Sequence, residues 1–117
     1  MENYKDLIVW KRAMELVGAA YQVAAMLPRE EIYALSDQLK RSAVSIPSNI
    51  AEGYGRNSTK DYARFLCIAR GSRYELETQL LLCVQLNYVQ QKDIETAIQL
   101  GEEVGKMLNV IISKPGF

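Results

Sequence analysis

The chain has 117 residues, of which 49% are hydrophobic and 24% are charged. This length and composition predict one compact domain over residues 1–117 and exclude an intrinsically disordered chain. Lysine and arginine number 14, aspartate and glutamate also number 14, and histidine is absent. The commonest general base and the commonest transition-metal ligand are therefore missing, which argues against an enzyme and against a metal or cofactor site.

The longest strongly apolar run, Leu80–Val84, is far shorter than the roughly 18 residues that a membrane span requires. The N-terminus has acidic and amide residues where a secretory signal would have a basic and then an apolar stretch. We therefore expect a cytoplasmic protein without a membrane partner. Cys67 and Cys83 fall on one predicted helix, roughly 24 Å apart, which is too far for a disulfide, and we expect both to be buried thiols.

Apolar residues recur at helical spacing in four segments, and strand-like alternation is missing. The first predicted helix covers about residues 4–27 and ends at Pro28. The second covers about residues 31–52, and Gly53 is expected to stop it. Pro47 predicts a kink in this second helix, because proline lacks a backbone N–H and clashes with the preceding turn.

The third predicted helix covers about residues 58–86, with Ser58 as its N-cap, Asp61 in its first turn and Asn87 as a left-handed cap. The fourth covers about residues 91–113. Helices of this length with short connections favour antiparallel neighbours. The sequence therefore predicts an all-α fold, an antiparallel up-down-up-down four-helix bundle.

The first and the third predicted helices carry more apolar surface than one core-facing stripe needs. In the third helix the second half is apolar nearly all round, through Leu80, Leu81, Leu82, Cys83, Val84 and Leu86. This pattern indicates either a wide core-facing stripe or self-association. Gly101 and Gly105 lie one turn apart in the fourth helix, which indicates either a close approach by a neighbouring helix or surface glycines that the helix tolerates.

Charge is distributed unevenly along the chain. Residues 40–73 hold seven basic and two acidic side chains, whereas both flanking regions are net acidic. Six of the basic residues are candidates for binding nucleic acid: Lys40, Arg41, Arg56, Lys60, Arg64 and Arg70. The alternative is that the arginines are consumed in ion pairs, as Arg73 with Glu77 suggests. The isoelectric point of about 6.3 favours this alternative, because typical nucleic-acid binders are strongly basic.

The run from Ser45 to Gly53 places a proline and hydrogen-bonding side chains inside a helical pattern, through Ser45, Pro47, Asn49, Glu52 and Gly53. One interpretation is a polar site that includes the Glu75 carboxylate, since two carboxylates can serve acid–base or metal chemistry. The other is structural: Asn49 and Ser45 bond carbonyls that Pro47 leaves free, and Glu52 meets Arg70 or Arg73. The sequence shows no other nucleophile, phosphate-binding or metal-ligand motif.

This motif, with Gln38–Ser42 before it and Gly55–Ser58 and Ile68–Glu77 after it, resembles the four-helix-bundle proteins called 23S rRNA intervening-sequence proteins. That family is similar to the accessory proteins of diversity-generating retroelements. The resemblance implies a ring-like homopentamer and an RNA or DNA partner, although the retroelement proteins are markedly basic and this chain is neutral. We therefore expect a non-enzymatic oligomeric bundle. It is either a nucleic-acid-associating scaffold or a protein-interaction hub that presents Tyr54 and Tyr33.

Overall fold

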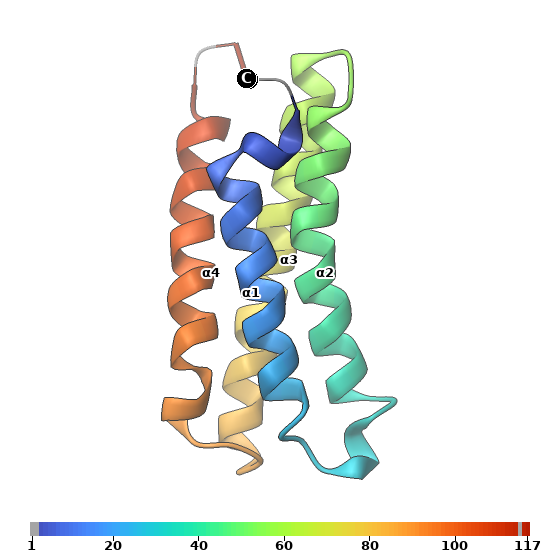
Figure 1. The fold of residues 1–117 in the computed structure, drawn as a ribbon, viewed down its shortest axis with the longest axis vertical. Helices are drawn as coiled ribbons and strands as arrows, with labels where there is room; N and C mark the ends of the chain where they lie inside the picture. The colour runs from blue at the N-terminus through green and yellow to red at the C-terminus, as the bar shows by residue number, and fades with distance from the viewer. Residues whose placement is uncertain (1–2, 115) are drawn as a thin grey trace.

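The computed structural model describes residues 3–114 and 116–117, which form a four-helix bundle (Figure 1). The helices are α1 (Ile8–Ala24), α2 (Leu35–Tyr54), α3 (Thr59–Gln85) and α4 (Gln91–Ile112), and the described residues contain no strand. Successive helices run in opposite directions, and α1 lies in front of α3 in the view of Figure 1. Both α1 and α3 pack against α2 and α4. The predicted all-α up-down-up-down bundle is confirmed.

The first helix is shorter than the predicted range of 4–27. A separate 3-10 turn covers Tyr4–Asp6, because the Asn3 side chain accepts a hydrogen bond from the Lys5 N–H at 2.8 Å. Leu7 is then extended, with a ψ of 126°, and α1 begins after it. At the other end Ala25 is the C-cap, three residues before Pro28.

The second helix begins and ends later than predicted. Its start is displaced from residue 31 to Leu35, because the Glu31 carboxylate accepts a hydrogen bond from the Leu35 N–H at 3.1 Å and so caps the helix from the preceding turn. The sequence predicted that Gly53 stops the helix, and this prediction is wrong. Gly53 lies buried inside the last turn of α2. The helix continues through Pro47, and the kink expected there stays a prediction.

Gly53 is required by the packing of α2 on α3. A methyl group at this position would lie 2.7 Å from the Cβ atom of Phe65 and 3.1 Å from a ring carbon of Tyr62. Any larger residue would force the two helices apart. The glycine therefore sets a close approach of two helices rather than a helix end.

The local signals around α3 and α4 are confirmed. The Ser58 Oγ accepts a hydrogen bond from the Asp61 N–H at 3.0 Å, and Asn87 is left-handed with a φ of 62°. Both helices have bounds within one residue of the prediction. The start of α4 carries a cap that the sequence analysis missed, in which the Asp93 carboxylate accepts from the Gln90 N–H at 2.8 Å.

The hydrophobic core runs along the bundle and receives side chains from all four helices. Its largest fully buried members include Leu16, Leu39, Ile46, Ile50, Leu66, Leu76, Leu80, Ile94 and Leu108. Cys83 is buried, as predicted, and burial raises the pKa of its thiol to about 11. Cys67 is exposed, so the prediction of a second buried thiol is wrong. Within the described part of the chain, no helix is both long enough and apolar enough to span a membrane.

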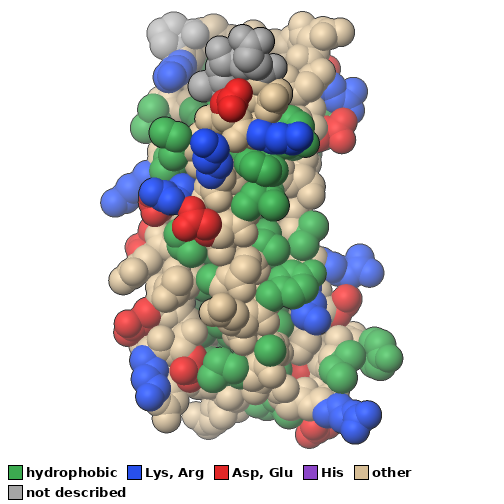
Figure 2. Space-filling model, viewed as in Figure 1, with side chains coloured by type: hydrophobic (Ala, Val, Ile, Leu, Met, Phe, Trp, Pro, Cys, Tyr) green, Lys and Arg blue, Asp and Glu red, His purple; other side chains and the backbone are tan. Residues whose placement is uncertain are grey.

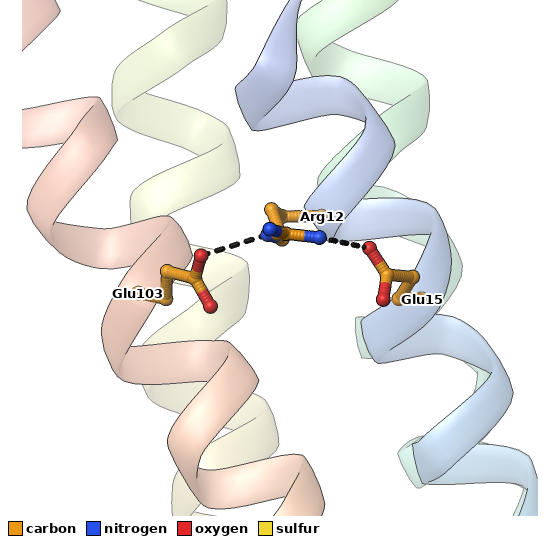
Figure 3. A network of polar contacts seen from close by, with 3 residues as sticks. All are labelled: Arg12, Glu15 and Glu103. Atoms are coloured by element: carbon orange, nitrogen blue, oxygen red, sulfur yellow. Dashed lines mark hydrogen bonds and ion pairs between the residues drawn. The ribbon is translucent and has the colours of Figure 1, made fainter.

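An ion-pair bridge joins α1 to α4 on the surface. The Arg12 guanidinium lies between Glu15 of its own helix and Glu103 of α4, with N···O distances of 2.7 Å to each (Figure 3). These two carboxylates, Glu15 first, raise the pKa of Arg12. All three side chains are more than 40% exposed, so the bridge defines the side-by-side placement of α1 and α4 more than it stabilises the bundle.

Candidate nucleic-acid interface

The six basic candidates do not form one patch. Lys40 and Arg41 lie near the beginning of α2, about 21 Å along the helix from its end at Tyr54. Arg56, Lys60 and Arg64 lie at the turn between α2 and α3, and we call these three residues the corner cluster. Arg70 lies further along α3, towards the middle of the bundle. The structure therefore brings together only three of the six candidates.

The corner cluster is organised around one aromatic ring. The guanidinium carbons of Arg56 and Arg64 lie 4.9 Å and 4.7 Å from the centroid of the Phe65 ring, within the range of a cation–π contact. Lys60 is exposed and has no ion-pair partner among the described residues. Arg56 also pairs with Glu52 at 3.0 Å, which compensates part of the charge. The cluster thus presents Lys60 and Arg64 as its two uncompensated cations.

The other candidates make contacts of their own. Arg41 pairs with Asp37 at 2.9 Å, and the Lys40 ammonium lies 5.2 Å from the centroid of the Tyr21 ring. Arg70 donates a hydrogen bond to the Asn109 Oδ1 at 3.1 Å and so bridges α3 and α4. Side chains of both signs are mixed on the face of the bundle that Figure 2 shows. The alternative that the arginines form ion pairs therefore applies to Arg41 and Arg56 among the six candidates.

Arg73 is the most buried arginine in an ion pair, with its side chain 12% exposed. Its predicted pairing with Glu77 is confirmed at 3.4 Å, and its Nε donates to the Gly101 carbonyl at 2.9 Å. A methyl group on Gly105 would lie 3.2 Å from the guanidinium carbon. A close approach is therefore present at Gly105, where the approaching group is an arginine side chain from α3, whereas a methyl group on Gly101 would lie 3.8 Å from the Arg73 Nε, an ordinary contact.

The Ser45–Gly53 motif forms a polar seam between α2 and α3. The Asn49 Nδ2 donates to the carbonyl and to the hydroxyl of Ser45, at 2.8 Å and 2.9 Å, and the Ser45 and Ser72 hydroxyl oxygens lie 2.7 Å apart. The seam also includes a bond from the Ser42 hydroxyl to the Gln79 side chain at 2.6 Å, which the sequence analysis missed. Ser42 fits the core-facing spacing of α2, and that spacing was the available signal.

Two details of the predicted motif are corrected. A helical proline at 47 leaves the carbonyl of residue 43 without its donor, yet Asn49 bonds the Ser45 carbonyl, because side chains reach back four residues. Glu52 pairs with Arg56 rather than with Arg70 or Arg73, because it is exposed and its i+4 neighbour is the nearest cation.

The alternative polar site with Glu75 is not assembled. Glu75 is exposed on α3, and none of the recorded contacts of Ser45, Asn49 or Glu52 reaches it. No group of three or more His, Cys, Asp or Glu side chains in the described ranges could hold a metal ion. Of the two tyrosines expected on the surface, Tyr33 is 95% exposed, whereas Tyr54 is half-buried beside Tyr62, with 5.8 Å between ring centroids.

Comparison with known proteins identifies a family. A search of curated proteins found no match. Among solved structures, the chain is similar to a protein of unknown function from the S23 ribosomal protein family of Bacteroides thetaiotaomicron. The TM-score is 0.84 and the identity 27%, over 92% of this chain and 100% of that chain. The model of the 23S rRNA-intervening sequence protein family matches residues 5–110. The chain therefore belongs to the family of 23S rRNA-intervening sequence proteins.

Proposed function

We propose that this protein is a non-enzymatic, homo-oligomeric helical bundle that associates with RNA through the corner cluster. The observation that carries the proposal is the placement of Lys60 and Arg64 on the first turns of α3, exposed and without carboxylate partners among the described residues. Phe65 holds the Arg64 guanidinium in position, so less side-chain freedom is lost when a phosphate binds.

Self-association is supported by two apolar surfaces on different sides of the chain. On α3 and its C-cap residue, five large side chains between 36% and 54% exposed form what we call the α3 face: Ile68, Tyr74, Leu81, Leu82 and Leu86. Between α1 and α2 lies an open groove of about 330 Å³ lined mainly by apolar residues, which we call the α1–α2 groove: Tyr4, Trp10, Met14, Val17, Val44, Pro47, Ser48 and Ala51. Hydrophobic side chains recur along that side in Figure 2.

Two different surfaces favour head-to-tail contact, in which the α3 face of one copy covers the α1–α2 groove of the next. Such contacts form a closed ring where the rotation from copy to copy closes, and the family resemblance implies a ring of five copies. The corner cluster would then repeat around one rim. A modest local charge would become a continuous positive field that suits a phosphate backbone.

The test is a matched pair of variants. Lys60→Gln with Arg64→Gln removes one lysine and one arginine from the corner cluster, and Lys92→Gln with Arg29→Gln removes the same charges at the opposite end of the bundle. We expect affinity for structured RNA to fall with salt. The corner variant should have a salt slope smaller by about 0.7 to 0.9 for each phosphate that it no longer neutralises. The opposite-end variant should bind like the wild type.

Two results would contradict the proposal: no RNA binding by the wild-type chain at low salt, or an equal loss of affinity in both double variants. Equal losses would mean that net charge matters and the corner cluster does not. Fluorescence anisotropy with a labelled RNA hairpin at several salt concentrations measures both quantities.

A second candidate is a protein-interaction scaffold that does not bind nucleic acid. It is favoured by Tyr33, which is 95% exposed beside Ile32 at 48% in the connection between α1 and α2. Exposed tyrosines are common anchors at protein interfaces. Tyr33→Ala should abolish recovery of a specific partner from native cells, and Tyr54→Phe should retain it. Recovery that is unchanged by Tyr33→Ala would remove this candidate.

A further inference from the structure

An open cavity of about 800 Å³ lies at the end of the bundle where α1 begins and α4 ends. Its walls are mainly apolar and come from Leu7, Ile8, Met107, Val110, Ile111 and Phe117. Ile8 and Val110 are 64% and 60% exposed, a high value for branched aliphatic side chains that share one hollow. A volume of this size lies within the range of pockets that hold small apolar ligands.

One wall of the cavity is formed by the aromatic rings of Tyr62 and Phe117. The Phe117 ring packs edge-on against the Tyr62 ring with 5.6 Å between centroids, so Phe117 closes one side of the hollow. Burial raises the pKa of the Tyr62 hydroxyl, which agrees with limited access of water to this side of the cavity. The surface that a ligand would meet there is apolar, and removing it from water favours binding.

The charged residues of the lining are Lys106, Lys114 and Asp6. Lys106 lies on α4, six residues before its end at Ile112, and Lys114 lies two residues after that end. Both are exposed, and the structure records no ion pair for either among residues 3–114 and 116–117. Two cations against one anion give the lining a net positive charge above an apolar interior.

We propose that this cavity binds a free single-chain fatty carboxylate, with its chain on the apolar walls and its carboxylate near Lys106 and Lys114. The apolar interior selects the chain, and the positive lining selects an anionic head group over a cationic one. The inference does not depend on RNA association, because none of the corner cluster residues lines the cavity.

Isothermal titration calorimetry with dodecanoate, kept below its micelle concentration, tests the proposal on the full chain. We expect saturable binding of dodecanoate and none of dodecyltrimethylammonium. Val110→Trp fills the cavity and should abolish binding. Ile32→Trp adds the same ring in the exposed connection between α1 and α2, outside the cavity and outside both self-association surfaces, and should leave binding unchanged. Lys106→Gln with Lys114→Gln should weaken dodecanoate binding by up to about tenfold.

Several outcomes would overturn the inference. They are absence of saturable binding, equal binding of the cationic detergent, and equal loss of binding in Val110→Trp and Ile32→Trp. A change of oligomeric state in Val110→Trp alone, measured by light scattering, would identify the cavity as an interface between copies and would also overturn it. Binding to anionic vesicles without binding of free dodecanoate would assign the hollow to a membrane surface instead. Circular dichroism of each variant confirms that the bundle is folded.

Discussion

At the scale of single residues, three helical glycines meet very different surroundings. A methyl group at Gly53 would lie 2.7 Å from the Cβ atom of Phe65, and one at Gly105 would lie 3.2 Å from the Arg73 guanidinium. Nothing lies within 4 Å of the same position at Gly18, in the middle of α1. The same glycine-to-alanine change should therefore have opposite effects at these sites.

We expect Gly53→Ala to destabilise the bundle by about 1–3 kcal/mol, because Phe65 is held close to the helix backbone and cannot yield cheaply. Gly105→Ala should cost less, since its neighbour is a side chain that can shift by a few tenths of an ångström. Gly18→Ala is the control and should stabilise by about 0.5–1 kcal/mol through helix propensity. Urea denaturation measures all three, and a stabilised Gly53→Ala variant would contradict the packing argument.

A second prediction at this scale concerns pH. The Glu31 carboxylate accepts hydrogen bonds from the Tyr88 hydroxyl at 2.7 Å and from the Leu35 N–H at 3.1 Å. These bonds, that from Tyr88 first, hold the pKa of Glu31 below its ordinary value of 4.5. Because the pKa is lower in the folded chain, the stabilisation is complete above the unfolded pKa. It is lost as the pH falls through the folded pKa.

Glu31→Gln keeps an acceptor oxygen but removes this titration. The melting temperature of the wild type should exceed that of Glu31→Gln at about pH 6, and the difference should shrink towards about pH 3. Glu30→Gln alters an exposed carboxylate that has no recorded ion pair in the described ranges, and it serves as the control. A difference for Glu31→Gln that is constant over this pH range would show that the carboxylate charge is unimportant.

At the scale of elements, local sequence signals predicted some helix ends and not others. Ser58 and Asn87 act within a few residues of their own position, and both predictions were correct. The predicted start of α2 was wrong because the Glu31 side chain caps the helix from the turn before it. The Tyr88 hydroxyl, from a segment distant in the sequence, donates a hydrogen bond to the same Glu31 carboxylate. The role of Gly53 depends on Phe65 across the interface, which no local pattern reveals.

The same reasoning applies to the candidate site. Helical spacing predicted the i+4 pair of Arg73 with Glu77 correctly. Helical spacing could not identify which arginine pairs with Glu52, because the ion-pair partner depends on which side chains are exposed on each helix. It also grouped Lys40 with Lys60, which the lengths of α2 and α3 place far apart. Charge counted along the chain is therefore a weak guide to charge gathered in space.

The polar seam between α2 and α3 yields the prediction at this scale. Ser45→Ala would leave the Ser72 hydroxyl and the Asn49 amide short of a partner, at a cost of about 1–3 kcal/mol. Ser45→Ala combined with Ser72→Ala should cost less than the sum of the single changes, because the two hydroxyls share one hydrogen bond. Ser48→Ala, on the exposed side of α2, should stay within about 0.5 kcal/mol of the wild type. Additive losses of stability in denaturant melts would argue against the shared bond.

At the scale of the whole molecule, two of the apolar surfaces that the bundle leaves uncovered suit contact between copies. The α3 face includes Leu81, which is 48% exposed, and the α1–α2 groove includes Met14, which is 47% exposed. Because α1 and α3 pack against α2 and α4 rather than chiefly against each other, their outward sides face opposite directions (Figure 1). Contact between the unlike surfaces would extend from copy to copy until a ring closes.

This arrangement makes a specific prediction for mixtures of variants. Met14→Glu blocks the α1–α2 groove and Leu81→Glu blocks the α3 face, so each variant alone should be monomeric in light scattering. A mixture of the two retains one good copy of each surface and should form a dimer that grows no further. Ile32→Glu, which alters a side chain of similar exposure outside both surfaces, should keep the wild-type assembly. If a like surface met its own copy instead, one variant would still assemble alone and mixing would add nothing. A wild-type chain that is monomeric at every concentration would exclude self-association altogether.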